Sequence, residues 1–250
     1  MSSLVRLASR SAPRRRLICL PYAGGGVAPY RQWTRSLPDD VEVLAAQLPG
    51  RESRLRESPL ASIVMMADAV LAELEGMTDL PYAIFGHSMG ALIAYEMTLA
   101  LEQRGYHPPS HVFVSARRPP DEPDQRPPLH ALPEPEFIVE LQRRYGAIPD
   151  AVLAEPELLE LLLPIVRADI RAVETYEPPR DAARIKCPVT VYGGDLDAHP
   201  TPAQLPLWNR ATVDPVRVRV FSGDHFYLNV QRDALTADIA ARWSAERAVA

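Results

Sequence analysis

The sequence predicts an α/β fold in which a mostly parallel sheet carries helices on both of its faces. Two observations lead to this prediction. Six short apolar segments alternate with segments of helical periodicity, a pattern typical of parallel strands joined by helical crossovers. The stretch Gly86-His87-Ser88-Met89-Gly90 places a serine between a strand pattern and a helix pattern. The length of 250 residues fits one domain of this kind with a sizeable core.

The predicted strands are short apolar runs. Runs of this length are typical of strands that are buried in a parallel sheet. They span residues 17–20, 41–46, 82–85, 111–116, 189–192 and 216–221.

The predicted core helices follow three of these strands. Apolar residues recur with helical spacing over 62–75, 91–104 and 234–247. Gly76 and Gly105 come directly after the first two segments, where glycine is the expected C-terminal stop.

Residues 119–178 break the alternation. Seven prolines lie between positions 119 and 135, and amphipathic helical pieces follow at 136–145, 157–163 and 165–176. Pro164 is expected to interrupt or kink the last two pieces. The length and the proline-rich start favour a helical lid inserted into a single domain that spans 1–250, with a core of about 17–118 and 179–250. The alternative is that these helices only complete the outer layer of the fold.

The composition limits the classes of function. The net charge of −5 argues against a general nucleic-acid-binding protein, because such proteins present a basic surface to the phosphates. No apolar segment approaches the length of a membrane span. Cys19 and Cys187 are too few for a disulfide framework and are expected to be buried thiols in a reducing compartment. We therefore expect a cytoplasmic protein without nucleic-acid or membrane partners.

The serine motif predicts nucleophilic catalysis. A G-x-S-x-G pattern between a strand and a helix is typical of a nucleophile elbow, which raises the serine hydroxyl clear of the backbone at the helix N-terminus. Ser88 is therefore the predicted nucleophile. In this arrangement an Asp or Glu and then a His follow the serine in chain order. His225 comes just after the last predicted strand and is the predicted base, with His199 as its main competitor.

Two aspartates follow the fifth predicted strand, in Gly193-Gly194-Asp195-Leu196-Asp197. Both qualify as the acid of the triad. We select Asp197 because the acid commonly follows the glycine by three positions, and we expect Asp195 to form a turn. The alternative is a metal site made by Asp195, Asp197 and His199, but no partner cluster occurs elsewhere in the sequence. The sequence thus predicts no metal.

The tetrahedral intermediate of such a reaction requires an oxyanion hole. One N–H is expected from Met89, the residue after the nucleophile, and a second from a loop after an early strand. The glycine-rich stretch Pro21-Tyr22-Ala23-Gly24-Gly25-Gly26 follows the first predicted strand. It lacks the spacing of phosphate-binding and dinucleotide-binding loops, so no nucleotide cofactor is expected.

Several stretches together resemble one family of enzymes. They are Leu20-Pro21-Tyr22-Ala23-Gly24-Gly25, Gln47-Leu48-Pro49-Gly50-Arg51-Glu52, Gly86 to Glu96, Gly223-Asp224-His225-Phe226, and the lid pieces 132–134 and 145–149. The chain resembles the type II thioesterases, stand-alone α/β-hydrolases that accompany modular polyketide and nonribosomal peptide synthases. The Leu-Pro-Gly-Arg-Glu stretch is the specific part of this resemblance, because generic esterases share only the elbow.

The resemblance implies a function and a set of site residues. Ser88, Asp197 and His225 match the triad, and Ala23 and Met89 match the oxyanion donors. The implied reaction is hydrolysis of acyl groups on the phosphopantetheine arm of an acyl or peptidyl carrier protein, which clears stalled or aberrant chains from a synthase. The chain departs from the family pattern at Ala198-His199, where relatives often carry proline.

Three other functions remain open at this point. A carboxylesterase or lipase would use the same triad. A cyclising thioesterase domain cut from a synthase is disfavoured by the start methionine and by the lack of an upstream carrier segment. A non-catalytic carrier-binding module is disfavoured by the intact triad order. Four arginines could meet an acidic carrier protein or be solvated surface charges: Arg117, Arg118, Arg143 and Arg144.

Overall fold

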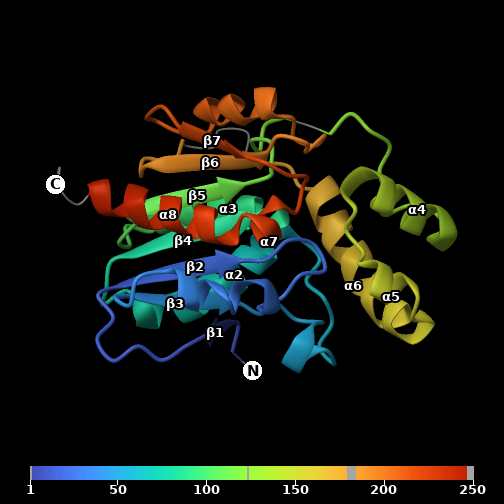
Figure 1. Ribbon diagram of the computed structural model, residues 1–250, viewed down its shortest axis with the longest axis horizontal. Coiled ribbons are helices and arrows are strands. Elements are labelled where there is room, and N and C mark those ends of the chain that lie inside the picture. The colour runs from blue at the N-terminus through green and yellow to red at the C-terminus, as the bar shows by residue number, and fades with distance from the viewer. Residues whose placement is uncertain (1, 123, 179–183, 247–250) are drawn as a thin grey trace.

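The computed structural model describes residues 2–122, 124–178 and 184–246. Within them the chain forms one sheet with the strand order β1-β3-β2-β4-β5-β6-β7 (Figure 1). The strands are β1 (Leu4–Arg6), β2 (Arg15–Leu20), β3 (Val41–Ala46), β4 (Tyr82–His87), β5 (His111–Ser115), β6 (Val189–Gly194) and β7 (Arg217–Phe221). All neighbouring strands are parallel except β1, which runs antiparallel to β3. The predicted α/β class with a mostly parallel sheet is therefore confirmed.

The six predicted strands are all present, with ends that differ by up to two residues. The strand β1 was not predicted. It is only three residues long, and a single fully buried apolar side chain, Leu4, anchors it against the edge strand β3. So short a segment carries no periodicity that a sequence pattern could detect.

Helices cover both faces of the sheet (Figure 1). The longer core helices are α2 (Ile63–Leu74), α3 (Met89–Gln103) and α8 (Arg232–Glu246), as predicted, although residue 247 lies outside the described residues. Shorter helical pieces are α1 (Trp33–Ser36), α7 (Tyr227–Val230), and the 3-10 turns η1 (Ala28–Tyr30), η2 (Glu52–Arg54), η3 (Glu75–Met77) and η4 (Pro202–Arg210). Gly105 takes a positive φ of 70° just past α3, as expected of a helix stop. Gly76 does not stop α2, which continues into η3 instead.

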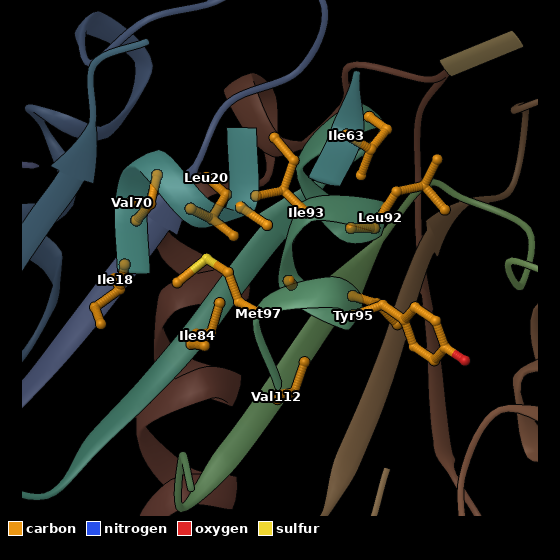
Figure 2. Packing of buried hydrophobic residues seen from close by; sticks show 14 of the residues in the cluster. Ile18, Leu20, Ile63, Val70, Ile84, Leu92, Ile93, Tyr95, Met97 and Val112 are labelled. Atoms are coloured by element: carbon orange, nitrogen blue, oxygen red, sulfur yellow. The ribbon is translucent and has the colours of Figure 1, made fainter. Parts of the chain in front are cut away.

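The two faces of the sheet are set by the alternation of side chains along each strand. In β2, Ile18 and Leu20 pack under α2 and α3, whereas Leu17 and Cys19 face the side of α1 and α8. Figure 2 shows the first of these cores, where side chains of α2 and α3 meet those of β2, β4 and β5. Cys19 is buried and Cys187 is partly buried.

A helical segment is inserted between β5 and β6. It contains α4 (Glu134–Tyr145), α5 (Asp150–Leu153) and α6 (Pro156–Glu174), which lie together beyond one end of the sheet (Figure 1). These helices have a small core of their own, which includes Phe137, Leu141 and Val166. None of the helices in the described part of the chain is long and apolar enough to cross a membrane.

The expected interruption at Pro164 is wrong, because α6 is a single helix with Pro164 inside it. Proline at this point removes one backbone N–H from the helix. The helix continues through the proline, and Leu163, Ile165 and Val166 on either side of it are buried, so both halves are held by packing.

Candidate active site

Ser88 lies at a sharp turn between β4 and α3. Its backbone has φ 53° and ψ −110°, a conformation that costs energy for a residue with a side chain. The flanking glycines make the turn possible. A Cβ on Gly86 would lie 2.0 Å from the Gly90 oxygen, and a Cβ on Gly90 would lie 2.3 Å from the Leu20 oxygen. The Ser88 N–H donates to the Ser115 oxygen at 2.8 Å, which fixes the turn to the end of β5.

The structure brings together the three residues predicted for the triad. Ser88 Oγ lies 3.0 Å from His225 Nε2, and His225 Nδ1 lies 2.8 Å from Asp197 Oδ2. Asp197 comes from the loop after β6 and His225 from the loop after β7, so both approach Ser88 from neighbouring strand ends. Both side chains are buried, with residue exposures of 4% and 5%. The arrangement gives a serine hydroxyl a base, and gives the base an orienting carboxylate.

The two aspartates of the loop after β6 make different contacts. The second oxygen of Asp197, Oδ1, accepts the His199 N–H at 2.8 Å. Asp195 is exposed, accepts the Gly223 N–H at 2.8 Å, and donates its own N–H to Phe221. Asp195 therefore ties the loop after β6 to the loop after β7, in agreement with the expected turn-forming role.

The other histidines near the elbow have structural contacts. His87 is fully buried beside Ser88, its Nδ1 lies 2.8 Å from Ser115 Oγ, and burial holds the pKa of its ring well below the usual range. Its side chain points into the fold, as predicted. His199 contacts the triad through its backbone, because its N–H donates to Asp197 Oδ1. No cluster of three or more side chains suited to a metal ion occurs in the described part of the chain.

The glycine-rich loop after β2 passes beside Ser88. We call residues 22–28 the oxyanion loop. Four of its N–H groups are engaged. Gly24 donates to Asp169 Oδ2 at 2.7 Å, Gly25 donates to the Tyr22 oxygen at 2.8 Å, and Val27 and Ala28 both donate to the Glu52 carboxylate. The Ala23 N–H has no acceptor among the described residues. Met89 is the first residue of α3, so its N–H has no partner within the helix and lies at the positive end of the helix dipole.

A pocket opens over Ser88 and His225. Its walls come from the oxyanion loop (Tyr22 and Ala23) on one side and from α4 and α6 on the other. The inserted helices contribute mostly apolar side chains, namely Leu141, Tyr145, Val166, Ile170 and Val173. The inserted segment thus supplies a mostly apolar wall of the pocket at Ser88.

The four arginines considered for carrier contact do not form an exposed basic patch. Arg117 lines the active-site pocket. Arg118 pairs with Asp124 at 3.0 Å, and Arg144 is buried against Glu140. Arg143 is the exposed member, and it pairs with Glu140 at 2.7 Å.

No sequence pattern identified the pocket residues Tyr22, Tyr145 and Phe226, or Asp169, whose carboxylate contacts the oxyanion loop. Tyr22, Tyr145 and Phe226 lie within the stretches that carry the family resemblance, which would have been the available indication. Asp169 lies outside these stretches, and in the sequence it resembles an ordinary polar position of an amphipathic helix.

The comparisons with known proteins agree with this geometry. The family model described as "Thioesterase domain" matches residues 15–242. The gramicidin S biosynthesis protein GrsT of Aneurinibacillus migulanus is 38% identical over 218 residues, which cover 87% of this chain and 84% of that protein. The chain belongs to the thioesterase family. It is therefore a thioester hydrolase, and Ser88, Asp197 and His225 all lie within the matched region.

Solved structures of similar thioesterases have the same fold. The type II thioesterase BorB from the borrelidin biosynthetic cluster matches with a TM-score of 0.86 and 34% identity, over 96% of this chain and 97% of that chain. The RedJ thioesterase from the prodiginine pathway of Streptomyces coelicolor matches with a TM-score of 0.83 and 38% identity, over 94% and 88% of the two chains. The predicted resemblance of this thioesterase to type II thioesterases is thus confirmed.

Proposed function

We propose that this thioesterase hydrolyses acyl groups held as thioesters on the phosphopantetheine arm of an acyl or peptidyl carrier protein. Its role would be to clear stalled or aberrant chains from a polyketide or nonribosomal peptide synthase. The observation that carries the proposal is the hydrogen-bonded array of Ser88, His225 and Asp197 beneath an apolar pocket. The type II thioesterases and antibiotic-biosynthesis proteins among its relatives support the class of substrate.

In the first half of the proposed reaction, Ser88 attacks the thioester carbonyl. His225 Nε2, at 3.0 Å, takes the hydroxyl proton as the bond forms. Asp197 holds the ring so that Nδ1 carries the other proton, and it stabilises the imidazolium. The N–H groups of Ala23 and Met89 stabilise the negative oxygen, each by about 2.7–4 kcal/mol in comparable sites.

The tetrahedral intermediate then collapses. The carbon–sulfur bond breaks, and His225 returns its proton to the leaving thiol, whose pKa of about 8–9 makes it a good leaving group. In the second half, His225 activates a water molecule that attacks the acyl-Ser88 ester. The free acid leaves and Ser88 is restored.

We further propose that residues 119–178 act as a lid on a single hydrolase domain spanning 1–250, whose core is about 17–118 and 179–250. Residues 123 and 179–183 lie outside the described residues. The apolar side chains that α4 and α6 place over Ser88 support an acyl-binding role for this segment. The contact with the carrier protein would be transient, since the carrier can leave once its acyl group has been transferred to Ser88. The reaction would take place in the cytoplasm.

The experiment is a comparison of matched substrates. Acyl-carrier thioesters, acyl-pantetheine thioesters and the corresponding oxygen esters are assayed with the same acyl chain, over a series of chain lengths. We expect the highest kcat/KM for the carrier-bound thioester. Faster hydrolysis of the oxygen ester would indicate a carboxylesterase, and binding of the carrier without turnover would indicate a non-catalytic module.

A further inference from the structure

The sequence stretch most specific to type II thioesterases, Gln47 to Glu52, contributes no member of the triad. In the structure it lies against the outer side of the oxyanion loop. Arg51 donates to the Gly25 oxygen at 2.9 Å. Glu52 accepts the N–H groups of Val27 at 3.1 Å and Ala28 at 3.3 Å. Two consecutive residues thus hold the oxyanion loop by its backbone.

The third participant comes from the inserted segment. Asp169 of α6 is fully buried and receives two hydrogen bonds from the Arg51 guanidinium, both at 2.9 Å. The same carboxylate accepts the Gly24 N–H at 2.7 Å. Arg51 and Asp169 therefore form a buried bidentate ion pair in which each member also binds the oxyanion loop.

The contact between α6 and the loop is close. A Cβ on Gly24 would lie 2.6 Å from Cγ2 of Val166, which is one helical turn before Asp169. Gly24 has φ 75°, a backbone conformation that glycine adopts most easily. Helix α6 therefore packs directly against the residue that follows Ala23 in the oxyanion loop.

We propose that Asp169 and Arg51 are positioning residues that hold the oxyanion loop in its working conformation, and that they do so only while α6 is in place. If α6 moves away, Asp169 leaves with it, so that Gly24 loses its acceptor and Arg51 loses its carboxylate partner. Placing α6 over the pocket and completing the oxyanion hole are then one event. The proposal rests on the proposed function in taking Ala23 as an oxyanion donor.

A buried ion pair can also serve stability alone, so the test needs a matched control. The pair Arg16–Glu42 provides it, with an Nε–Oε2 distance of 2.7 Å and both side chains at least nine-tenths buried. This pair lies at the start of β2, whereas the oxyanion loop follows the end of that strand. Glu42→Gln should lower the stability of the protein without changing the geometry of the active site.

The experiment compares Asp169→Asn, Arg51→Lys and Glu42→Gln with the wild-type enzyme. Thermal unfolding, kcat and KM on an acyl-pantetheine thioester, and the affinity for an alkyl boronic acid are measured for each. The serine oxygen adds to the boron of a boronic acid, and the resulting tetrahedral boronate places one of its oxygens where the oxyanion forms. The wild type serves as the reference for all three measurements.

We expect Asp169→Asn to lower kcat by about 10- to 100-fold and to weaken boronic acid binding by a similar factor, with KM changed by less than about threefold. The kcat and the boronic acid affinity of Arg51→Lys should lie between those of Asp169→Asn and the wild type, because lysine keeps the charge but cannot make the bidentate contact. Glu42→Gln should change only the unfolding temperature. Unchanged kcat in Asp169→Asn, or an equal loss in Glu42→Gln at equal stability, would overturn the proposal.

The boronic acid measurement separates this proposal from the proposed function. A wild-type enzyme that binds the boronic acid but does not hydrolyse thioesters would contradict the proposed function. The boronic acid affinities of the three variants would then still decide the positioning role. If Asp169→Asn does not fold, Arg51→Lys still decides the question, because its smaller change keeps a cation beside Asp169.

Discussion

At the scale of single residues, the loop after β6 divides two tasks between two aspartates. Asp197 is buried and contacts His225 Nδ1 at 2.8 Å. Asp195 is exposed and connects this loop to Gly223. In the proposed mechanism the acid is therefore Asp197, whereas Asp195 connects the loop after β6 to the loop after β7.

We predict that Asp197→Asn lowers kcat by about 10⁴-fold, because an amide in this position favours the wrong tautomer of the base. Asp195→Asn should cost less than about tenfold, since its amide oxygen can still accept the Gly223 N–H. Steady-state hydrolysis of one thioester substrate by both variants gives the comparison. A larger loss in Asp195→Asn would mean that the acid has been assigned to the wrong residue.

The sequence predicted that Asp197 and His225 come together with Ser88, because the elbow motif and the order of strand ends limit the candidates to a few. It did not predict Asp169. The partner of this carboxylate, Arg51, lies 118 positions earlier in the chain, and no local pattern connects the two. A charge that is buried through a long-range pair can be recognised only once the fold brings its partner close.

At the scale of elements, the elbow depends on close contact between β4, α3 and the end of β2. A Cβ on Gly90 would lie 2.3 Å from the Leu20 oxygen and 3.0 Å from the Pro21 oxygen. Both of these atoms are backbone, so neither can rotate away. The strand that carries Leu20 leads directly into the oxyanion loop, so a side chain at position 90 would displace the start of that loop.

We predict that Gly90→Ala lowers the free energy of unfolding by about 1–3 kcal/mol or more, because it overpacks the elbow. It should also reduce turnover, since β2 and the oxyanion loop must shift. Gly76→Ala is the matched control, because a Cβ there meets nothing within 4 Å. That variant should be neutral or slightly stabilising. Urea unfolding and thioester turnover measure both, and equal stability of the two variants would contradict this account of the elbow.

A second prediction concerns β5, where His111 is buried, stacks on Phe113 at 4.0 Å, and lies 2.9 Å from Thr190 Oγ1. Burial lowers the pKa of His111 to about 3. The unfolded chain, with an ordinary pKa of about 6.5, then binds a proton that the folded chain does not. The contribution of His111 to the free energy of unfolding is therefore fully present above pH 6.5 and is lost as the pH falls below it.

Between pH 7.5 and pH 5.5 this single group should cost about 1.4 kcal/mol of unfolding free energy. His111→Gln should therefore lose less stability over this interval than the wild type, by about that amount, even if it is less stable at pH 7.5. Urea unfolding at the two pH values provides the measurement. An identical pH dependence of the two proteins would contradict a neutral, buried His111.

The elements themselves were predictable to different degrees. Strands and helices with full apolar periods were found because their pattern is local. The strand β1 and the helix α5 were missed, because three or four residues carry no period. The continuity of α6 through Pro164 was missed for a different reason, since packing on both sides of the proline outweighed the local preference for a break.

At the scale of the whole molecule, the pocket lies between the sheet and the inserted helices, and neither part encloses it alone. The surface around it carries paired charges. Arg118 pairs with Asp124, and Arg143 and Arg144 both pair with Glu140. With a net charge of −5, the molecule offers no basic face from these residues that would attract an acidic carrier over long range.

We therefore predict a weak dependence on salt. The ratio of kcat/KM for an acyl-carrier substrate to that for the acyl-pantetheine thioester should change by less than about threefold between roughly 50 and 500 mM salt. Arg143→Ala should leave this ratio nearly unchanged, because exposed ion pairs contribute little. A steep fall with added salt that disappears in Arg143→Ala would show that this arginine steers the carrier after all.

The central claim is that Ser88 attacks the thioester of a carrier-bound acyl group, and its most direct test is the turnover of an acyl-carrier substrate by wild type and Ser88→Ala. The substitution removes only the hydroxyl, so circular dichroism and thermal unfolding should remain close to those of the wild type. Hydrolysis should fall to the uncatalysed rate of the thioester plus the small residual contribution of the oxyanion hole. Turnover by Ser88→Ala at a rate near that of the wild type would contradict the account.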